Sequence, residues 1–198
     1  EQLLYRSFKF GDLAQLTMMD LRTYRDAETT GANFANDDRT MLGKAQFDWV
    51  AQQLQESTAR WDVLGNSVMV SPMRFVTIPD DEKANIAAGY MKERATGIAV
   101  NSDQWDGYTA DRDRVLEALD AREGNSFFIT GDIHSEWAND IYLHDKRVAC
   151  ELVTTSITAP NIDEILTTYT GIYHAEDNST SLLIEDAIKG ANPWVKHL

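Results

Sequence analysis

The stretch Asn125–Asp140, NSFFITGDIHSEWAND, decides the fold. It opens with a short apolar run, Ser126 to Thr130, which has the length and composition of a buried strand. Gly131 ends this run, and Asp132 and His134 follow two residues apart. In extended backbone, side chains at i and i+2 point the same way. The spacing therefore predicts a carboxylate and an imidazole on one side of a strand end.

Asp132 and His134 are candidate metal ligands. Carboxylate oxygen and imidazole nitrogen bind di- and trivalent cations, and a bound cation can polarise phosphoryl oxygens and supply hydroxide at neutral pH. An alternative stays open, because Gly-Asp after a strand is also a common turn. In that case the aspartate bonds nearby backbone amides and the histidine is partly buried.

Around this stretch, short apolar runs alternate with amphipathic patterns. Four runs predict buried strands, at residues 13–20, 67–73, 126–130 and 147–153. Three apolar stripes predict helices, at residues 47–54, 115–119 and 183–188. Thr109 is the expected N-cap of the second helix, with Asp111 near its positive end and Gly124 beyond its last turn, and Gly190 is expected to stop the third. The order favours one layered α/β domain of mixed α+β type over residues 1–198.

Composition narrows the class of protein. The 198 residues are 43% hydrophobic and 10% aromatic, which is typical of a folded domain. A net charge of -14 opposes stable binding to nucleic acid, and no apolar run is long enough to span a membrane. The single cysteine, Cys150, cannot form an intrachain disulfide and is expected in the core. His144, at an expected hairpin tip, and His174 are interpreted as surface histidines.

Asp20 and Arg22 stand at the end of the first predicted strand, where ligand groups gather in open sheets. A guanidinium group matches two phosphate oxygens at once, so Arg22 or Arg25 could clamp a substrate phosphate. The alternative is an internal salt-bridge network in which Asp20 and Asp26 pair with these two arginines.

The segment DQWDGY, Asp103 to Tyr108, offers carboxylates and aromatic rings around Gly107. Trp105, Asp106 and Tyr108 could line the mouth of a substrate pocket, and the acids Asp103 and Asp106 could bind calcium or hold the loop through backbone bonds. The alternative is a turn that packs its aromatics over the following helix. The stretch 82–94 is a possible helix, and residues 80–104 could instead form an active-site loop or lid. Ser156 lacks the frame of a serine nucleophile, whereas Glu151 could hydrogen-bond a metal ligand.

Seven blocks in order resemble the PhoD-type alkaline phosphatases, a family of metal-dependent phosphomonoesterases and phosphodiesterases. They are YRSFKFGDL, MMDLRTYRD, MLGKAQFDWV, NSVMVSPM, DQWDGY, TGDIHSEWAND and CELVTTSITAPN, between Tyr5 and Asn161. The resemblance implies a metallophosphoesterase-like αββα sandwich and metal ions, with iron and calcium expected. It implies that Asp132 and His134 hold metal, that Arg22 neutralises charge developing in the reaction, and that Arg25 contacts substrate.

The chain also departs from this family. Family members carry an earlier metal-binding half with an acidic first ligand, a GD-containing strand end and a DHE-like element, and none of these occurs here. Residues 1–198 are therefore expected to be the C-terminal portion of a catalytic domain that needs this N-terminal part. Where the family usually has histidine after Asn-Pro, this chain has Trp194, and His197 does not simply take over its role.

The expected function is metal-dependent hydrolysis of small phosphate monoesters or diesters. Two alternatives stay open: a phospholipase D-like diesterase on the same fold, and a catalytically silent fragment or binding module. By resemblance, the expected location is periplasmic or secreted.

Overall fold

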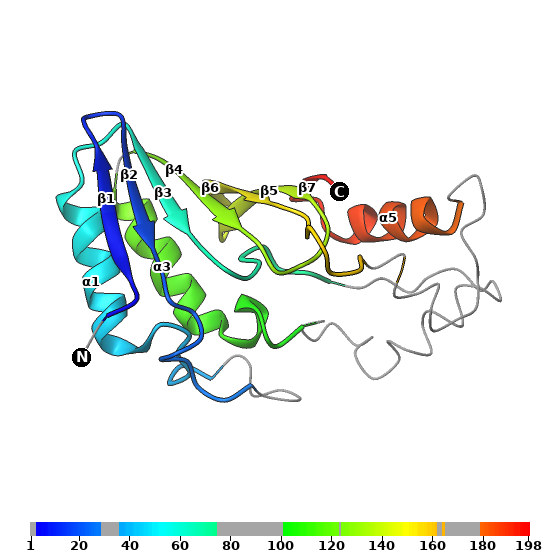
Figure 1. The fold of residues 1–198 in the computed structure, drawn as a ribbon, viewed down its shortest axis with the longest axis horizontal. Coiled ribbons are helices and arrows are strands. Elements are labelled where there is room, and N and C mark those ends of the chain that lie inside the picture. Colours follow the sequence, from blue (N-terminus) through cyan, green and yellow to red (C-terminus); the bar gives the residue numbers. More distant parts are fainter. Residues whose placement is uncertain (1–2, 29–35, 75–100, 123, 162–163, 165–178) are drawn as a thin grey trace.

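The computed structural model describes residues 3–28, 36–74, 101–122, 124–161, 164 and 179–198. These residues form one seven-stranded sheet with helices beside it (Figure 1). The strands are β1 (Arg6–Phe10), β2 (Ala14–Met18), β3 (Trp61–Gly65), β4 (Asn125–Thr130), β5 (Trp137–Leu143), β6 (Lys146–Val153) and β7 (Val195–His197). The helices are α1 (Gly43–Glu56), the short 3-10 helix η3 (Trp105–Gly107), α3 (Thr109–Ala121) and α5 (Ser179–Ala191).

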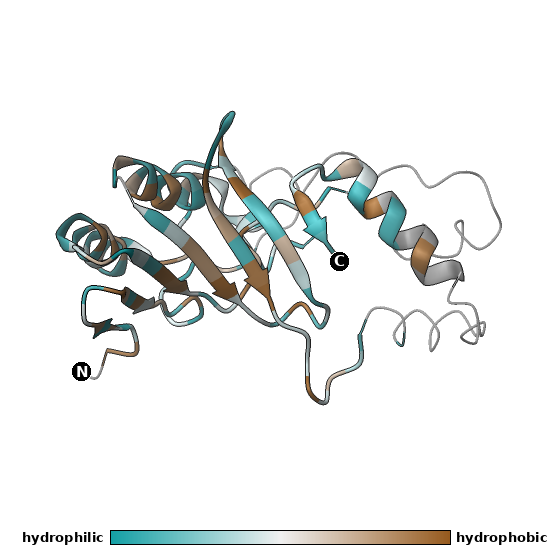
Figure 2. Ribbon diagram, turned by 90° about the horizontal axis from the view of Figure 1, so that it is seen from above, coloured by the Kyte–Doolittle hydropathy of each residue, from teal (hydrophilic) through white to brown (hydrophobic). Residues whose placement is uncertain are grey.

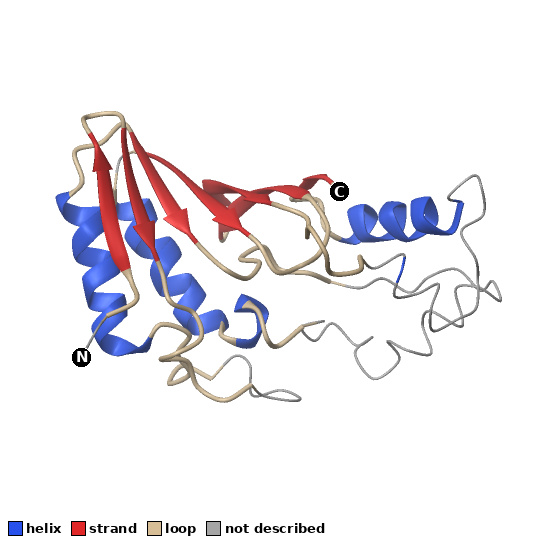
Figure 3. Ribbon diagram, viewed as in Figure 1, coloured by secondary structure: helices blue, strands red, loops and turns tan. Residues whose placement is uncertain are grey.

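The sheet is mixed, with strand order β1-β2-β3-β4-β6-β5-β7. Strands β2, β3, β4 and β6 are parallel neighbours, whereas β1 runs antiparallel to β2, and β5 runs antiparallel to β6 and β7. This confirms the expected α/β class. Because the carboxyl ends of parallel strands meet at one edge, the loops after β2, β3 and β4 leave the sheet together (Figure 3).

Helices α1 and α3 cover one face of the sheet and enclose the main core. The apolar stripes predicted for the first two helices are confirmed, since Val50 and Leu54 of α1 and Val115 and Leu119 of α3 are buried against it. A second cluster gathers where α5 meets the end of the sheet, with Ile188, Trp137, Met69, Met73, Val153 and Val195 buried together. No helix in the described ranges has the length and apolar character needed to cross a bilayer.

The strand predicted at residues 67–73 is wrong. The strand that follows α1 is β3, Trp61–Gly65, and the apolar run after it is a buried loop. Val70 and Ser71 donate their backbone amides to the Glu151 carboxylate, at 2.8 and 3.0 Å, instead of to a neighbouring strand. The run is apolar because it is enclosed, and burial alone does not distinguish a strand from a buried loop. The strands predicted at 13–20, 126–130 and 147–153 are confirmed as β2, β4 and β6.

Two local expectations need correction, and a third is confirmed. Tyr108, not Thr109, is the N-cap residue of α3, and it makes no side-chain capping bond. Asp111 lies in the first turn of α3 as predicted, and it is fully buried and accepts the amides of Met41 and Leu42, at 2.7 and 2.9 Å, where the chain enters α1. Cys150 is only half-buried because it lies on the sheet face away from α1 and α3, although partial burial still raises the pKa of its thiol.

The helix and loop expectations for residues 82–94 and 80–104 fall almost wholly outside the described residues, as does His174. His144 is exposed at the β5–β6 hairpin tip, as predicted, and its φ is 52°. Helix α5 ends at Ala191, one residue past the predicted stop at Gly190.

The opposite face of the sheet, here called the open face, carries exposed apolar side chains. Because side chains alternate along strands, one register places Phe8 and Phe10 of β1, Trp61 of β3, Ile129 of β4 and Leu152 of β6 on this face. Their exposed fractions run from 39 to 59%. Figure 2 shows α1 and α3 on the other side of the sheet, with no described helix over this one. A continuous apolar face of this kind is typical of an association surface.

Residues 1–198 expressed alone are therefore expected to self-associate despite the net charge of -14. The double substitution Phe10→Glu with Leu152→Glu should shift the chain toward monomer, because it places charges on the open face. Sedimentation velocity over a concentration series measures this shift. Leu13→Glu is the matched control, since Leu13 is 61% exposed but lies in the turn between β1 and β2. A monomeric wild-type chain with a cooperative melt would contradict the expectation.

Candidate functional site

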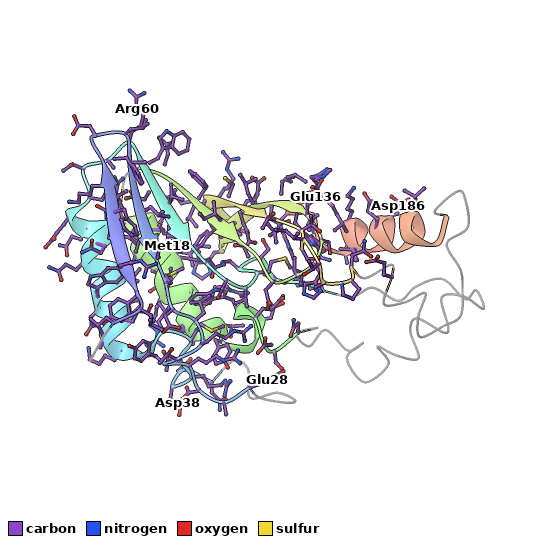
Figure 4. The ribbon with its side chains drawn as sticks, in the orientation of Figure 1. Met18, Glu28, Asp38, Arg60, Glu136 and Asp186 are labelled. Atoms are coloured by element: carbon purple, nitrogen blue, oxygen red, sulfur yellow. The ribbon has the colours of Figure 1, made fainter. Side chains whose placement is uncertain are left out.

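Polar side chains gather at the carboxyl edge of the parallel strands. The loop after β2 supplies Asp20, Arg22 and Arg25, and the loop after β4 supplies Asp132 and His134. Residues 101–103, which lead into η3, lie against the loop after β2. Figure 4 shows Met18, the last residue of β2, far from Arg60, which precedes β3 at the opposite edge of the sheet. Sequence reasoning therefore placed both loops at the correct edge.

Arg22 joins the two loops. Its Nη2 donates to Asp132 Oδ2 at 3.1 Å, and its Nη1 lies 2.8 Å from both carboxylate oxygens of Asp103. Hydrogen bonding to the Asp103 carboxylate raises the pKa of Arg22 above its ordinary value, so the guanidinium is permanently charged. The structure thus brings Arg22 and Asp132, which are 110 residues apart, into direct contact.

Arg25 binds the same carboxylate from a more enclosed position. Its Nη1 donates to Asp103 Oδ1 at 2.7 Å and to the Asp103 carbonyl oxygen at 3.0 Å. The Arg25 side chain is 19% exposed, against 43% for Arg22. Burial would raise the pKa of Asp103, but the hydrogen bonds from Arg22 and Arg25 outweigh it and hold this pKa below its ordinary value. One carboxylate is therefore shared between two guanidinium groups.

The salt-bridge alternative had the wrong partners. Asp20 Oδ1 accepts the backbone amides of Arg22 and Thr23, at 3.0 and 3.1 Å, and Gln46 holds the Asp20 backbone from α1. Burial would raise the pKa of Asp20, but hydrogen bonds from Thr23 and the Arg22 amide lower it. The arginines pair with Asp103 and Asp132 instead. Asp103 comes from a distant segment, which local sequence could not identify.

The backbone argument for Asp132 and His134 is also wrong. Asp132 has φ of 70° and His134 has φ of 62°, so both residues are in the left-handed region and not in extended backbone. Ile133 donates its amide to the Gly131 carbonyl oxygen at 2.9 Å, which closes a tight turn directly after β4. The turn still presents the Asp132 carboxylate to Arg22, because it forms at the carboxyl edge. Two positive φ values so close together place strain beside the site.

His134 is oriented by the backbone. Its Nδ1 lies 2.9 Å from the Pro160 carbonyl oxygen, and a carbonyl oxygen can only accept, so Nδ1 carries the proton. In the neutral ring Nε2 then has the free lone pair. Histidines that bind metals usually donate their other ring nitrogen to a carbonyl or carboxylate in this way. The arrangement therefore fits a metal ligand.

The donor types at this edge suit a hard cation. Besides Asp132 and His134, Asp20 has a buried Oδ2 with no hydrogen-bond partner within the described part of the chain. Within those same ranges, however, no group of three or more His, Cys, Asp or Glu side chains is arranged to hold a metal ion. These residues fit part of a metal site, and further ligands would have to come from elsewhere.

Trp105, Asp106 and Tyr108 are buried, with exposed fractions of 1, 5 and 0%. Asp106 accepts the Met73 amide at 2.8 Å and pairs with Arg112, while burial raises the pKa of its carboxyl. A side chain at Gly107 would collide with the Ser102 carbonyl oxygen, 2.0 Å from an added Cβ, so the turn requires glycine. The geometry favours the packed-turn interpretation over direct substrate contact for all three residues.

Glu151 connects the loop after β3 to the end of β4, whereas the sequence suggested only a hydrogen bond to a metal ligand. It is fully buried, and besides the Val70 and Ser71 amides it accepts from the hydroxyls of Thr130 and Ser71, at 2.9 and 2.7 Å. Thr130 is the last residue of β4 and immediately precedes the Gly131–Asp132 turn. Glu151 thus fixes where the Asp132 loop begins relative to its neighbour.

Trp194 and His197 serve structural contacts. Trp194 Nε1 donates to the Pro72 carbonyl oxygen at 2.8 Å, and the Arg74 guanidinium lies 5.1 Å from the centroid of its indole ring. His197 Nε2 lies 2.9 Å from Glu136 Oε1 on the β5–β7 edge. Tryptophan therefore anchors the segment after β3 at the position where a histidine was expected.

Comparison with known proteins agrees with this geometry. The profile of the PhoD-like phosphatase family matches residues 1–197. Alkaline phosphatase D of Bacillus subtilis (strain 168) is 30% identical over 169 residues, which cover 79% of this chain and 26% of that protein. The solved structure titled "Structure of PhoD" superposes with a TM-score of 0.72 at 28% identity and covers 100% of this chain and 34% of that one. The chain thus spans only about a quarter to a third of these relatives, and it belongs to the PhoD-like phosphatase family.

Proposed function

We propose that this chain forms part of the active site of a metal-dependent phosphoesterase that hydrolyses small phosphate monoesters or diesters. The observation that carries the proposal is the 3.1 Å contact between Arg22 and Asp132 at the carboxyl edge of a PhoD-like sheet. It puts a candidate phosphate-binding guanidinium beside a candidate metal-binding carboxylate. Such a pair meets the needs of phosphoryl transfer, in which positive groups must surround a phosphate.

Each residue then has a definite task. Asp132 Oδ2 and His134 Nε2 would hold metal, expected to be iron and calcium, and bound metal would supply a Lewis acid and an activated oxygen nucleophile. Arg22 neutralises negative charge on the phosphoryl oxygens as the ester bond breaks. Arg25, more deeply enclosed, orients the same phosphate group. The Pro160 carbonyl keeps the proton of His134 on Nδ1, away from the metal side.

The rest of the site belongs, in this proposal, to an N-terminal half of the same catalytic domain. Two observations support it. The described donors make up less than a metal site, and the open face leaves a broad apolar surface uncovered. The relatives are three to four times longer than the stretch this chain matches. They therefore have sequence that could supply both the further metal ligands and a cover for the open face. Residues 1–198 alone should therefore show little or no hydrolysis. The expected periplasmic or secreted location belongs to the same proposal and is tested by cell fractionation.

His134→Ala tests the metal role in a protein that contains the N-terminal half. We expect turnover and metal content to fall together, because loss of a ligand removes both the cation and the nucleophile it activates. The loss in metal affinity or activity should exceed the roughly 10- to 100-fold seen when only a hydrogen-bond partner of a metal ligand is removed, because His134 is proposed as the ligand itself. Elemental analysis and a phosphatase assay on one preparation measure both quantities.

His144→Ala is the matched control, because His144 is exposed at the far hairpin tip. If His134→Ala leaves metal and rate unchanged, His134 is a structural residue and the metal assignment fails. Assays with paired monoester and diester substrates separate a phosphatase from a phospholipase D-like diesterase. Metal-dependent hydrolysis by residues 1–198 alone would instead show that the chain needs no second half.

A further inference from the structure

We propose that the Asp103 carboxylate is an internal substitute for the substrate phosphate. This carboxylate occupies the anion site formed by Arg22 and Arg25 until a phosphate group displaces it. This inference rests on the proposed function. It adds one step to ligand binding, because any phosphate ligand must first displace Asp103 from the two arginines. Asp103 thereby becomes a residue that sets the affinity of the site for phosphate.

The contacts of Asp103 are those that an oxyanion would make. Arg22 Nη1 lies 2.8 Å from both of its oxygens, and Arg25 Nη1 lies 2.7 Å from one of them. Guanidinium groups bind carboxylate and phosphate through the same fork of N–H donors, so the two anions are interchangeable partners. The carboxylate is 30% exposed and Arg22 is 43% exposed, so solvent and ligands can reach the pair.

The side chain can leave without moving the turn. Gln104, Trp105 and Asp106 are buried and hold the segment directly after Asp103. Arg25 Nη1 also donates to the Asp103 backbone carbonyl, and Asn101 Oδ1 accepts the Asp103 amide at 3.0 Å. These bonds involve only the backbone of Asp103. Rotation about its side-chain bonds is therefore enough to free the guanidinium groups while Arg25 keeps one anchor.

Charge requires this displacement. Two guanidinium groups face two carboxylates here, Asp103 and Asp132, so the cluster is neutral before a ligand arrives. A phosphate group bound while Asp103 still holds the arginines would lie against the negative carboxylate of Asp103, and repulsion at such distances is strong in a partly buried site. Departure of Asp103 leaves the cluster with a positive charge for the incoming anion.

Asp103→Asn tests the proposal in the chain as it stands. Isothermal titration at constant ionic strength would measure the Kd of inorganic phosphate and of dimethyl phosphate for wild type and variant. We expect the substitution to lower both Kd values by the same factor, about three- to tenfold. The factor is the same because binding to the variant breaks no ion pair, whatever the charge of the ligand. Asp48→Asn is the matched control, since Asp48 is an exposed carboxylate paired with Lys44 on α1.

The other outcomes overturn the proposal. Weaker binding of both ligands would show that Asp103 holds the arginines in place. A larger gain for the doubly charged phosphate would show that Asp103 stays and merely repels. Binding of neither ligand by either protein would show that the arginines form no anion site. If phosphate binding tightens but the metal-loaded longer protein hydrolyses no ester, the proposed function fails and this inference stands. If ester hydrolysis is found while Asp103→Asn weakens phosphate binding, the proposed function stands and this inference fails.

Discussion

Arg22→Ala should lower kcat/KM for phosphate ester hydrolysis by about 10²- to 10³-fold in the complete catalytic domain, the range seen when a donor to developing negative charge is removed. The expected loss is large because Arg22 alone contacts both Asp103 and Asp132 among the described residues. Most of it should appear in kcat, since the charge on the phosphoryl oxygens is redistributed in the transition state. Steady-state kinetics together with metal analysis measure the effect.

Two further variants make this result interpretable. Arg22→Lys keeps one positive charge but loses the fork that spans two carboxylates, so it should recover only part of the rate. Arg147→Ala should leave the rate unchanged, because Arg147 pairs with Asp140 near the amino end of β6, away from the site. An Arg22→Ala protein with full metal and full rate would show that this arginine only ties the loops together.

Three interior strands of the sheet could be predicted from sequence because each contains a short, largely apolar run. The run is clearest in β4 and β6, whereas β2 buries the polar residues Gln15 and Thr17, and the interior strand β5 was not predicted. The two edge strands could not be predicted. β1 carries Lys9 and largely exposed residues, and β7 has three residues, so neither gives a periodic signal. The strand that corresponds to β3 was predicted at the neighbouring apolar loop instead. The sequence of β3 gives a weaker apolar signal, because its buried positions include Asp62, which is paired with Arg122.

The sequence predicted at which edge of the sheet the candidate site lies, but not which side chains contact one another there. Arg22, Asp132 and His134 were identified from motifs that end predicted strands, and all three lie at the carboxyl edge. Asp103 was considered as a calcium ligand or a loop residue, but its two arginine partners are 78 and 81 residues away in the chain. Spacing carries no information on such a pairing. The left-handed backbone at Asp132 and His134 was also hidden, because residue type does not fix φ at a turn.

Glu151 should make the largest single side-chain contribution to fold stability at this edge. Glu151→Ala is expected to lower the free energy of unfolding by about 3–4 kcal/mol, because buried donors lose a charged acceptor and a cavity remains. Those donors are the amides of Val70 and Ser71, the hydroxyls of Ser71 and Thr130, and Asn139 Nδ2 at 3.2 Å. Denaturant unfolding measures the loss, and Glu117→Ala, an exposed glutamate on α3, is the control.

Glu151→Gln separates the loss of acceptors from the loss of volume. An amide nitrogen at the Oε1 position would face the Val70 amide, whereas the Thr130 hydroxyl can rotate and accept from it. At the Oε2 position it would face the Ser71 amide and Asn139, so the first arrangement is preferred. One backbone donor is then left unpaired, which costs about 1–3 kcal/mol. Hydrogen exchange should accelerate at Val70 more than at Ser71. Equal stability of wild type and both variants would mean that packing alone holds the loop, and Glu151 would lose its role in placing the Asp132 turn.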